Sequence, residues 1–314
     1  MSFQYRASDL ALSTYLLGAY ATNLDLTLSF VGEFSPNGRT GTIPFAPPIL
    51  HYPNPYSAQM LDLLLSDYTI NTLLYHLHRR GLFTFRIGSE LPGVGDLLNT
   101  TCAGDDFYLD VSNEIQEMKD FGKHTDFYKR WKREDGVESL RNFGVCFGDI
   151  APEIREKNPD KRVYIIVKTV RAPSVQFKAA DRGTVIVELM ADGLIYLDGT
   201  SKRVGRVRVV TAFAVIPRLL NNQIIGTARI EYLKFVDIDK TFGLQQEAFD
   251  NLADLARGTI NRVVNSKLAQ GTPLSAPKLT IPIDLYNINI KVTERALLLS
   301  TDINVQPSML RLPN

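Results

Sequence analysis

Alternating apolar and polar positions divide most of the chain after Arg162 into predicted strands. Each run alternates as strands do when they bury one face, and the runs fall near 163–167, 185–189, 207–215 and 224–230. Turn signals separate them at Asp181-Arg182-Gly183, Asp192-Gly193 and Asp198-Gly199. Long strands with short turns predict a meandering antiparallel sheet that is strongly twisted or rolled.

One shorter helix is predicted from its ends as well as from its period. Ser66 is a good N-cap, Asp67 stands in the first turn, and Arg79 and Arg80 precede Gly81 at the end. The apolar positions on one stripe are Ile70, Leu73, Leu74 and Leu77. We therefore predict a helix with one apolar face, between a short strand at 60–65 and a second strand.

A longer helix is predicted over residues 244–268. Its apolar residues recur at spacings of three and four, and they are Phe249, Leu252, Ala256, Ile260 and Val263, with Val264 and Leu268 widening the stripe. Gly271 and Pro273 end it. A short helix is expected at 152–158, and two strands at 279–292 and 296–305 close the chain.

The pattern near the N-terminus does not predict one type of secondary structure. Residues 11–20 fit either a short helix or an apolar strand. Leucines at 24, 26 and 28 and Phe30 then alternate with polar residues and predict a half-buried strand. Five prolines between residues 44 and 55 keep the following segment extended.

The proline-rich segment and the unit after it resemble a known family. The likeness rests on VGEF at 31–34, PFAPPILHYP at 44–53 and LSDYTINTLLYHLHRRGLFTFRI at 65–87. These runs are similar to the second half of the bactericidal/permeability-increasing and lipopolysaccharide-binding family, which includes the plasma lipid-transfer proteins and belongs to the tubular lipid-binding superfamily. The likeness extends from about Leu24 to about Ile303 with one insertion.

This resemblance implies an α+β fold in which a strongly twisted antiparallel sheet is rolled into a barrel around one long and one shorter helix. A remnant of a first barrel, with central sheet and proline-rich linker, is implied over residues 1–58. The C-terminal lipid-binding barrel is implied over 59–305, with the insertion at about 89–148, and a tail over 306–314.

The resemblance also implies a non-enzymatic function, namely binding and transfer of phospholipid or a similar amphipathic lipid in an apolar pocket between helices and sheet. The two apolar stripes listed above are the implied walls, although core packing alone is the favoured explanation for each single residue. Every buried CH₂ contributes about 0.8 kcal/mol, so acyl chains need little polar recognition. Lipopolysaccharide or microbial-lipid recognition in innate defence, and an interaction module with a filled core, are the alternatives.

Bound phospholipid is the ligand implied, and no cofactor is expected. Implied partners are lipid, a membrane or lipoprotein surface, and either a missing N-terminal barrel or a second copy that pairs through the central sheet. A net charge of +1 gives no general attraction to nucleic acid. The sequence contains no run of 18 apolar residues that could span a bilayer as a helix.

Enzyme and metal signatures are missing from the sequence. There is no G-x-S-x-G, Walker A or G-x-G-x-x-G motif. His76 and His78 stand about 200° apart on the predicted helix, which suits surface histidines better than one metal site. Arg206 and Arg208 are expected on a solvated strand face.

Two cysteines and one sequon bear on the compartment. A bridge between Cys102 and Cys146 would close a loop of roughly 45 residues, stabilising by about 4 kcal/mol; two buried thiols are the alternative. Asn99 begins the only N-x-[ST] sequon and favours a glycosylated, extracellular loop. The N-terminus shows no convincing signal peptide. The resembling family is secreted, so we expect either the later part of a longer precursor or an isoform without an export signal.

Overall fold

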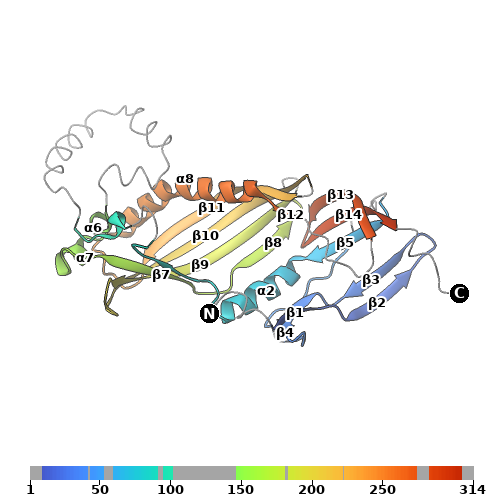
Figure 1. The fold of residues 1–314 in the computed structure, drawn as a ribbon, viewed down its shortest axis with the longest axis horizontal. Coiled ribbons are helices and arrows are strands. Elements are labelled where there is room, and N and C mark those ends of the chain that lie inside the picture. The colour runs from blue at the N-terminus through green and yellow to red at the C-terminus, as the bar shows by residue number, and fades with distance from the viewer. Residues whose placement is uncertain are drawn as a thin grey trace, which may run out of the picture.

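The computed structural model describes residues 9–41, 43–52, 59–90, 95–101, 146–180, 183–221, 223–273 and 283–305. They form an elongated, sheet-dominated α+β molecule (Figure 1). Among the helices that these residues form, none has the length and apolar composition needed to cross a membrane. The tail, Cys102 and most of the predicted insertion lie outside the described residues.

One long antiparallel sheet makes up most of the molecule. Its strands run in the order β12-β11-β10-β9-β7-β6, and β8 also pairs with β9. Their bounds are β6 Thr84–Ile87, β7 Val163–Thr169, β8 Ser174–Lys178, β9 Thr184–Leu197, β10 Arg203–Leu220, β11 Gln223–Asp237 and β12 Thr272–Pro273. The described strands form no closed barrel, so the predicted closure is not confirmed.

Two details of the predicted strands were wrong. Asp192-Gly193 is not a turn but lies inside β9, where Gly193 makes room for Ile165: a Cβ on Gly193 would stand 3.3 Å from its Cγ2 atom. The strand predicted to end at residue 230 continues to Asp237. A bulge leaves Glu231 without a register partner on β10, which interrupts the alternation that predicted the strand. The turn at Asp198-Gly199 is confirmed.

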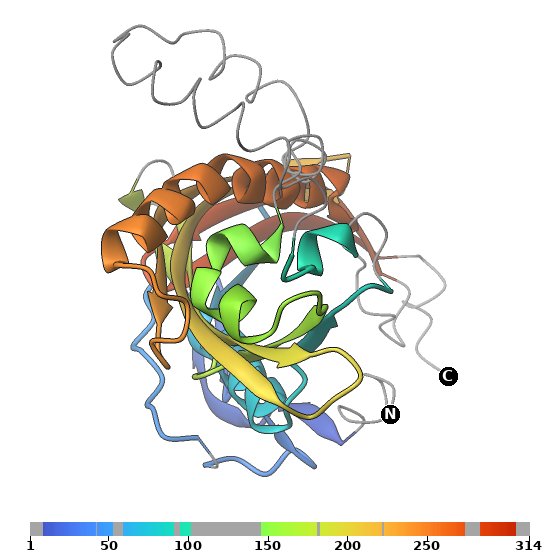
Figure 2. The ribbon, with the colours of Figure 1, turned by 90° about the vertical axis from the view of Figure 1, so that its left-hand side faces the viewer.

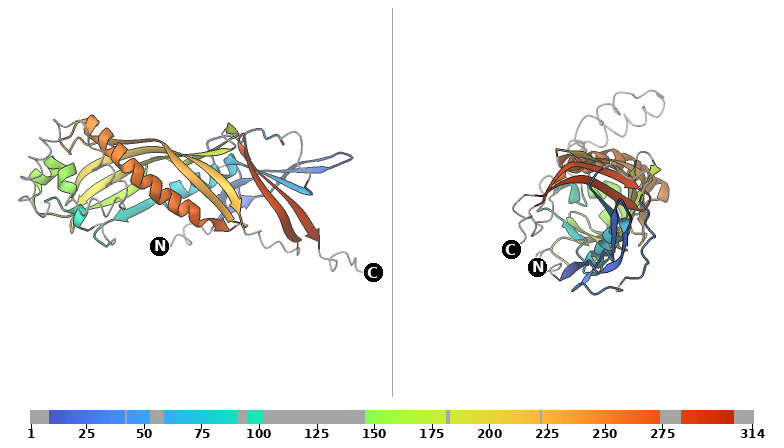
Figure 3. Two further views of the ribbon diagram at one scale, coloured as in Figure 1. Left: turned by 90° about the horizontal axis from the view of Figure 1, so that it is seen from above. Right: turned by 90° about the vertical axis from the view of Figure 1, so that its right-hand side faces the viewer.

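Smaller sheets occupy the other end of the molecule (Figure 3). Strands β5 Leu61–Ser66, β14 Ala296–Val305 and β13 Ile283–Thr293 form one of them in the order β13-β14-β5. Strand β1 Leu10–Ser13 pairs with β4 Glu33–Pro36, and β2 Leu16–Ala21 pairs with β3 Leu26–Phe30. The ambiguous residues 11–20 are therefore mostly strand.

The hairpin β2–β3 does not bury its apolar face as predicted. Leu26, Leu28 and Phe30 are 66%, 45% and 50% exposed, whereas Thr27 and Ser29 between them are half-buried. None of the described residues covers the apolar side of β3, which explains the inversion.

Both predicted helices form. Helix α2 spans Asp67–Arg79, with the Ser66 side chain accepting a hydrogen bond from the Tyr68 N–H and Gly81 taking a positive φ at the end. Helix α8 spans Gln246–Gln270, close to its predicted bounds. Short helices η1 Asp96–Leu98, α6 Phe147–Ile150 and α7 Pro152–Lys157 complete the fold.

The main core lies at the end of the long sheet that α6 and α7 cover (Figure 2). Phe242 packs edge-on against both Phe147 and Phe249, with ring centroids 5.9 and 5.5 Å apart. A second core cluster joins Ala253 of α8 to Ile230 and Leu233 of β11.

Candidate functional site

The long sheet has an inner and an outer face. The inner face contacts α8 and carries Phe213 of β10 and Ile230 of β11. Side chains alternate between the two faces along a strand. The positions between the inward ones therefore belong to the outer face, and Arg208, five residues before Phe213 on β10, is one of them. Arg208 and Arg206 do not form the plain solvated face that we predicted, since both are bound to the buried carboxylate of Asp192 on β9.

The inner face is apolar, and much of it is only half-buried. On the inner face of β7 to β10, the half-buried apolar residues include Ile165, Val167, Val175, Val185, Val187, Leu189, Val207, Val209, Phe213 and Val215. Core residues such as Phe249, at 2% exposed, are much more enclosed. Apolar side chains that face the helices but stay half-open leave apolar surface without close packing.

Helix α8 covers one edge of this face. Phe249 and Leu252 pack in the main core, and Ala256 and Ile260 pack on the second core cluster. Val263 is 57% exposed, so it does not face the sheet as the apolar stripe predicted. Four of the five predicted α8 wall residues therefore face the sheet, and Phe249 serves chiefly as core.

Helix α2 lies at the opposite edge and turns a polar side toward β4. It contacts β4 through buried Thr69, Thr72 and His76, and the Thr72 Oγ1 atom accepts a hydrogen bond from the Phe34 N–H at 2.9 Å. Leu77 of the predicted stripe is buried.

The rest of that stripe, Ile70, Leu73 and Leu74, stays half-buried. No residue of α2 belongs to either core cluster, so the structure does not bring the two predicted walls into one packed cluster.

Each helix is attached to a sheet edge by one asparagine. On α2, the Asn71 amide donates to the Val175 carbonyl and accepts from the Val175 N–H, both at 2.7 Å. On α8, Asn265 makes the same pair with Ala228 of β11, both at 2.8 Å. Each amide replaces the backbone groups of a missing neighbour strand, which sequence periodicity does not reveal.

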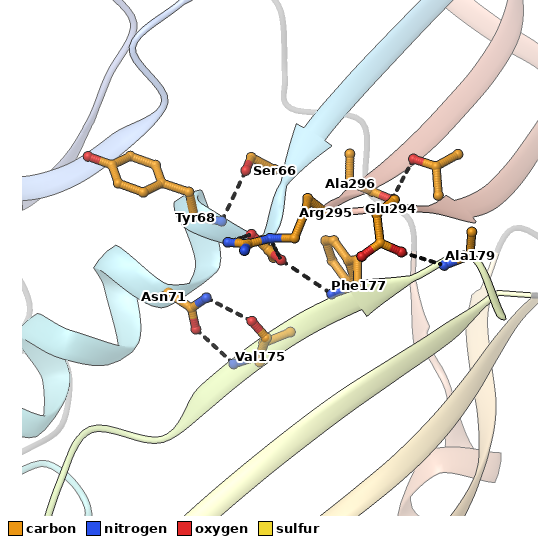
Figure 4. Close-up of polar contacts among 11 residues, drawn as sticks. Ser66, Tyr68, Asn71, Val175, Phe177, Ala179, Glu294, Arg295 and Ala296 are labelled. Carbon is orange, nitrogen blue, oxygen red and sulfur yellow. Dashed lines mark hydrogen bonds and ion pairs between the residues drawn. The ribbon is translucent and has the colours of Figure 1, made fainter. Parts of the chain in front are cut away.

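An ion pair with one buried partner fixes the start of α2 (Figure 4). The Asp67 carboxylate is fully buried and accepts hydrogen bonds from Arg295 Nε and Nη2 at 2.7 and 3.0 Å, and from the Phe177 N–H at 3.3 Å. Arg295 lies in the β13–β14 turn with φ +63°. We name these three residues the clamp; it holds α2, β8 and the β13–β14 turn together.

The histidines of α2 are not surface groups as predicted. His76 is buried, and burial lowers its pKa, as does the nearby Arg80 charge. His78 is half-buried, its Nδ1 atom lies 2.7 Å from Thr169 Oγ1, and burial with the charges of Lys168 and Arg79 lowers its pKa. The described residues contain no group of three or more His, Cys, Asp or Glu arranged to hold a metal ion.

Tyr68 and Glu33 form another buried polar pair on the β4 side of α2. The Tyr68 hydroxyl donates to Glu33 Oε2 at 3.1 Å, and burial together with the Glu33 charge raises the pKa of Tyr68 to about 12. The hydroxyl therefore stays protonated, which suits a structural link rather than acid–base chemistry.

A hollow of about 160 Å³ is lined by Thr184, Ala214, Ile216, Thr227, Ala228 and Arg229. Ala214 and Arg229 are register partners with the opposite alternation to Phe213 and Ile230, so this hollow lies on the outer face. It is smaller than usual ligand pockets of 300 Å³ or more and is not the predicted site.

The predicted bridge and sequon are described only in part. Cys146 is buried, whereas Cys102, its predicted partner, lies outside the described residues, so the bridge between them stays a prediction. Asn99 is half-buried, and its Oδ1 atom accepts a hydrogen bond from Arg162 Nε at 3.2 Å.

The fold is of the α+β class. One long antiparallel sheet carries a helix at each of two opposite edges, and half-open apolar side chains lie between these helices. The model of the LBP / BPI / CETP family, C-terminal domain, matches residues 16–119 and 124–305, and the chain therefore belongs to this family. The family is one of lipid-binding and lipid-transfer proteins. The matched ranges include residues 89–119 and 124–148, so only residues 120–123 of the predicted insertion fall outside them, and the insertion stays a prediction.

A crystal structure of lipopolysaccharide binding protein is similar to this chain at 20% sequence identity, with a TM-score of 0.43. The match covers 90% of this chain and 50% of that one, so the chain spans about half the length of that protein. Among curated proteins, no sequence matches the chain.

Proposed function

We propose that this chain binds a phospholipid or similar amphipathic lipid along the inner face of the long sheet, between α2 and α8, and transfers it. The observation that carries the proposal is that α2 buries its polar side more fully than its apolar stripe. This helix buries threonines and a histidine, while Ile70, Leu73 and Leu74 stay half-open. A helix without a ligand would be expected to bury its apolar stripe first.

Acyl chains suit such a surface because their binding requires burial of CH₂ groups and little directional bonding. Each CH₂ that leaves water contributes about 0.8 kcal/mol, so two chains supply a large favourable term. The elongated inner face matches the shape of such chains. The lipid would be held without covalent chemistry, as in a carrier rather than an enzyme.

The test is native mass spectrometry with lipid extraction, on protein secreted from eukaryotic cells. Near-stoichiometric phospholipid is expected, and Leu74→Trp with Ala256→Trp should lower the bound lipid by filling the space. Val263→Trp is the matched control, because this side chain is exposed and the same bulk should leave loading unchanged. Folded protein that stays lipid-free after incubation with vesicles would refute the proposal.

The same experiment covers the finer predictions. Extraction of lipopolysaccharide in place of phospholipid would support microbial-lipid recognition, the alternative function. The intact mass would show whether Asn99 carries a glycan and whether Cys102 and Cys146 are bridged. Glycan and bridge together would support an extracellular location.

A second candidate function, protein–protein interaction, is favoured by the hairpin β2–β3. The hairpin exposes an apolar surface, and its most exposed apolar residue is Leu24, at 96% exposed. Exposed apolar patches of this kind mark interaction sites. The candidate occupants are a domain like the first barrel of the family and a second copy of this chain. Light scattering of the purified chain should report a dimer for the second copy and a monomer otherwise.

A further inference from the structure

Five charged side chains gather on the outer face of the long sheet. The strand register places Lys168, Asp192 and Arg208 in one row across β7, β9 and β10. Arg206 and Lys234 lie in the neighbouring rows on either side, with the same alternation. We name these five residues the outer cluster; none of them belongs to the proposed lipid site.

Asp192 organises the outer cluster. Its side chain is 8% exposed and accepts Nε and Nη2 of Arg206 at 2.8 and 2.5 Å, and Nε and Nη2 of Arg208 at 2.8 and 3.2 Å. Burial by itself raises the pKa of Asp192, but the hydrogen bonds from Arg208 and Arg206 outweigh burial and lower it. The carboxylate therefore stays charged and holds two guanidinium groups side by side.

The outer cluster is positively charged and accessible. Four cations and one carboxylate leave a net charge of +3, although the whole chain carries only +1. The side chains of Arg206 and Arg208 are about 30% exposed, and Lys168 and Lys234 are exposed. Asp192 binds the Nε and Nη2 donors of each arginine, and within the part of the chain that the structure describes the Nη1 donors are left to bind an external acceptor.

Three features make this surface suited to anionic groups. The charges stand on a continuous sheet, and two of them are fixed by Asp192 before any ligand arrives, so little side-chain entropy is lost on binding. Half-buried apolar residues, Leu194 and Val210, lie between the charges. Equal numbers of positive and negative side chains would cancel, whereas the outer cluster keeps a net charge of +3.

We propose that the outer cluster docks the protein on the surface of an anionic phospholipid bilayer. This inference rests on the proposed lipid function, because a protein that takes lipid from bilayers has to contact them. Charge complementarity selects the partner: headgroup phosphates and carboxylates accept hydrogen bonds from guanidinium groups, and basic residues near an anionic leaflet are attracted to it.

Vesicle sedimentation tests the proposal, with phosphatidylcholine vesicles compared with vesicles that also contain phosphatidylserine. The variant Lys168→Gln with Lys234→Gln removes two charges and leaves Asp192 paired. Its partition onto phosphatidylserine vesicles should fall roughly tenfold or more. The control Lys267→Gln with Lys291→Gln removes two exposed charges from α8 and β13, so the net charge is matched and binding should be unchanged.

Added salt should also weaken wild-type binding, because the attraction is screened. Equal partition of the two double variants, or equal binding to neutral and anionic vesicles, would overturn the proposal. Cluster-dependent binding to poly-glutamate without vesicle binding would overturn the choice of a membrane as partner.

Native mass spectrometry of the same samples separates this proposal from the lipid function. A Lys168→Gln, Lys234→Gln protein that carries lipid but does not sediment supports docking by the outer cluster. Wild-type protein that sediments with anionic vesicles but never carries lipid also supports docking, while it refutes the lipid carrier.

Discussion

Breaking the clamp from its two sides should have unequal effects. Replacing Arg295 by glutamine leaves the carboxylate of Asp67, which is fully buried, without its ion-pair partner. Replacing Asp67 by asparagine strands only the Arg295 side chain, which is 41% exposed and can be hydrated. We therefore expect Arg295→Gln to lower the free energy of unfolding more than Asp67→Asn, although both changes remove the same ion pair.

The magnitudes follow from burial. Removing one partner of a fully buried ion pair costs 3–5 kcal/mol as a rule. Asp67 keeps the Phe177 N–H and the positive end of α2, so we expect about 2–4 kcal/mol for Arg295→Gln. Asp67→Asn weakens two charge-assisted hydrogen bonds, and with the discount for an exposed guanidinium we expect about 1–2 kcal/mol.

Urea unfolding of the two single variants and the double variant provides the assay, with similar m-values required for comparison. The double variant should lose less than the sum of the singles, by about 1 kcal/mol or more. Arg171→Gln breaks a surface pair with Glu188 and should cost less than about 1 kcal/mol. Additive losses, or a larger effect of Asp67→Asn, would refute the reasoning.

Three further predictions concern the two asparagines, His78 and the predicted bridge. Asn265→Ala should leave the Ala228 N–H and C=O without partners and lower the free energy of unfolding by about 1–3 kcal/mol. Amide hydrogen exchange should become faster at Ala228, and Asn71→Ala should have the same effects at Val175. Unchanged exchange at these amides would contradict this. Because burial lowers the pKa of His78 below 6.5, the unfolded chain binds its proton more readily. Stability should therefore fall as pH drops below about 6.5, and less in His78→Gln; urea midpoints at pH 7.5 and 5.5 that fall equally in both would count against it. Reduction of the predicted Cys102–Cys146 bridge should lower stability by about 4 kcal/mol, and an unchanged melting curve with reductant would exclude the bridge.

Local signals predicted the helices well. The Ser66 cap, the basic last turn and Gly81 place α2 within a residue of its observed bounds, since all of them act within a few residues of chain. The stripe on α8 was equally local, apart from Val263, which lies at the exposed margin of the stripe.

Contacts between distant segments were not predictable in the same way. Asp192-Gly193 has the composition of a turn, yet two arginines from β10 and a close neighbour on β7 keep it in a strand. His76 has the composition of a surface helix position, but β4 covers that side of α2. The clamp joins residues 228 positions apart, and no pattern on α2 indicates Arg295.

The paired asparagines have a consequence for how the molecule fails. An open sheet edge can recruit a strand from another chain, and the amides of Asn71 and Asn265 occupy such edges on β8 and β11. Lifting either helix would uncover a template for intermolecular pairing. A variant that loses both amides would expose both edges to pairing with strands of other chains.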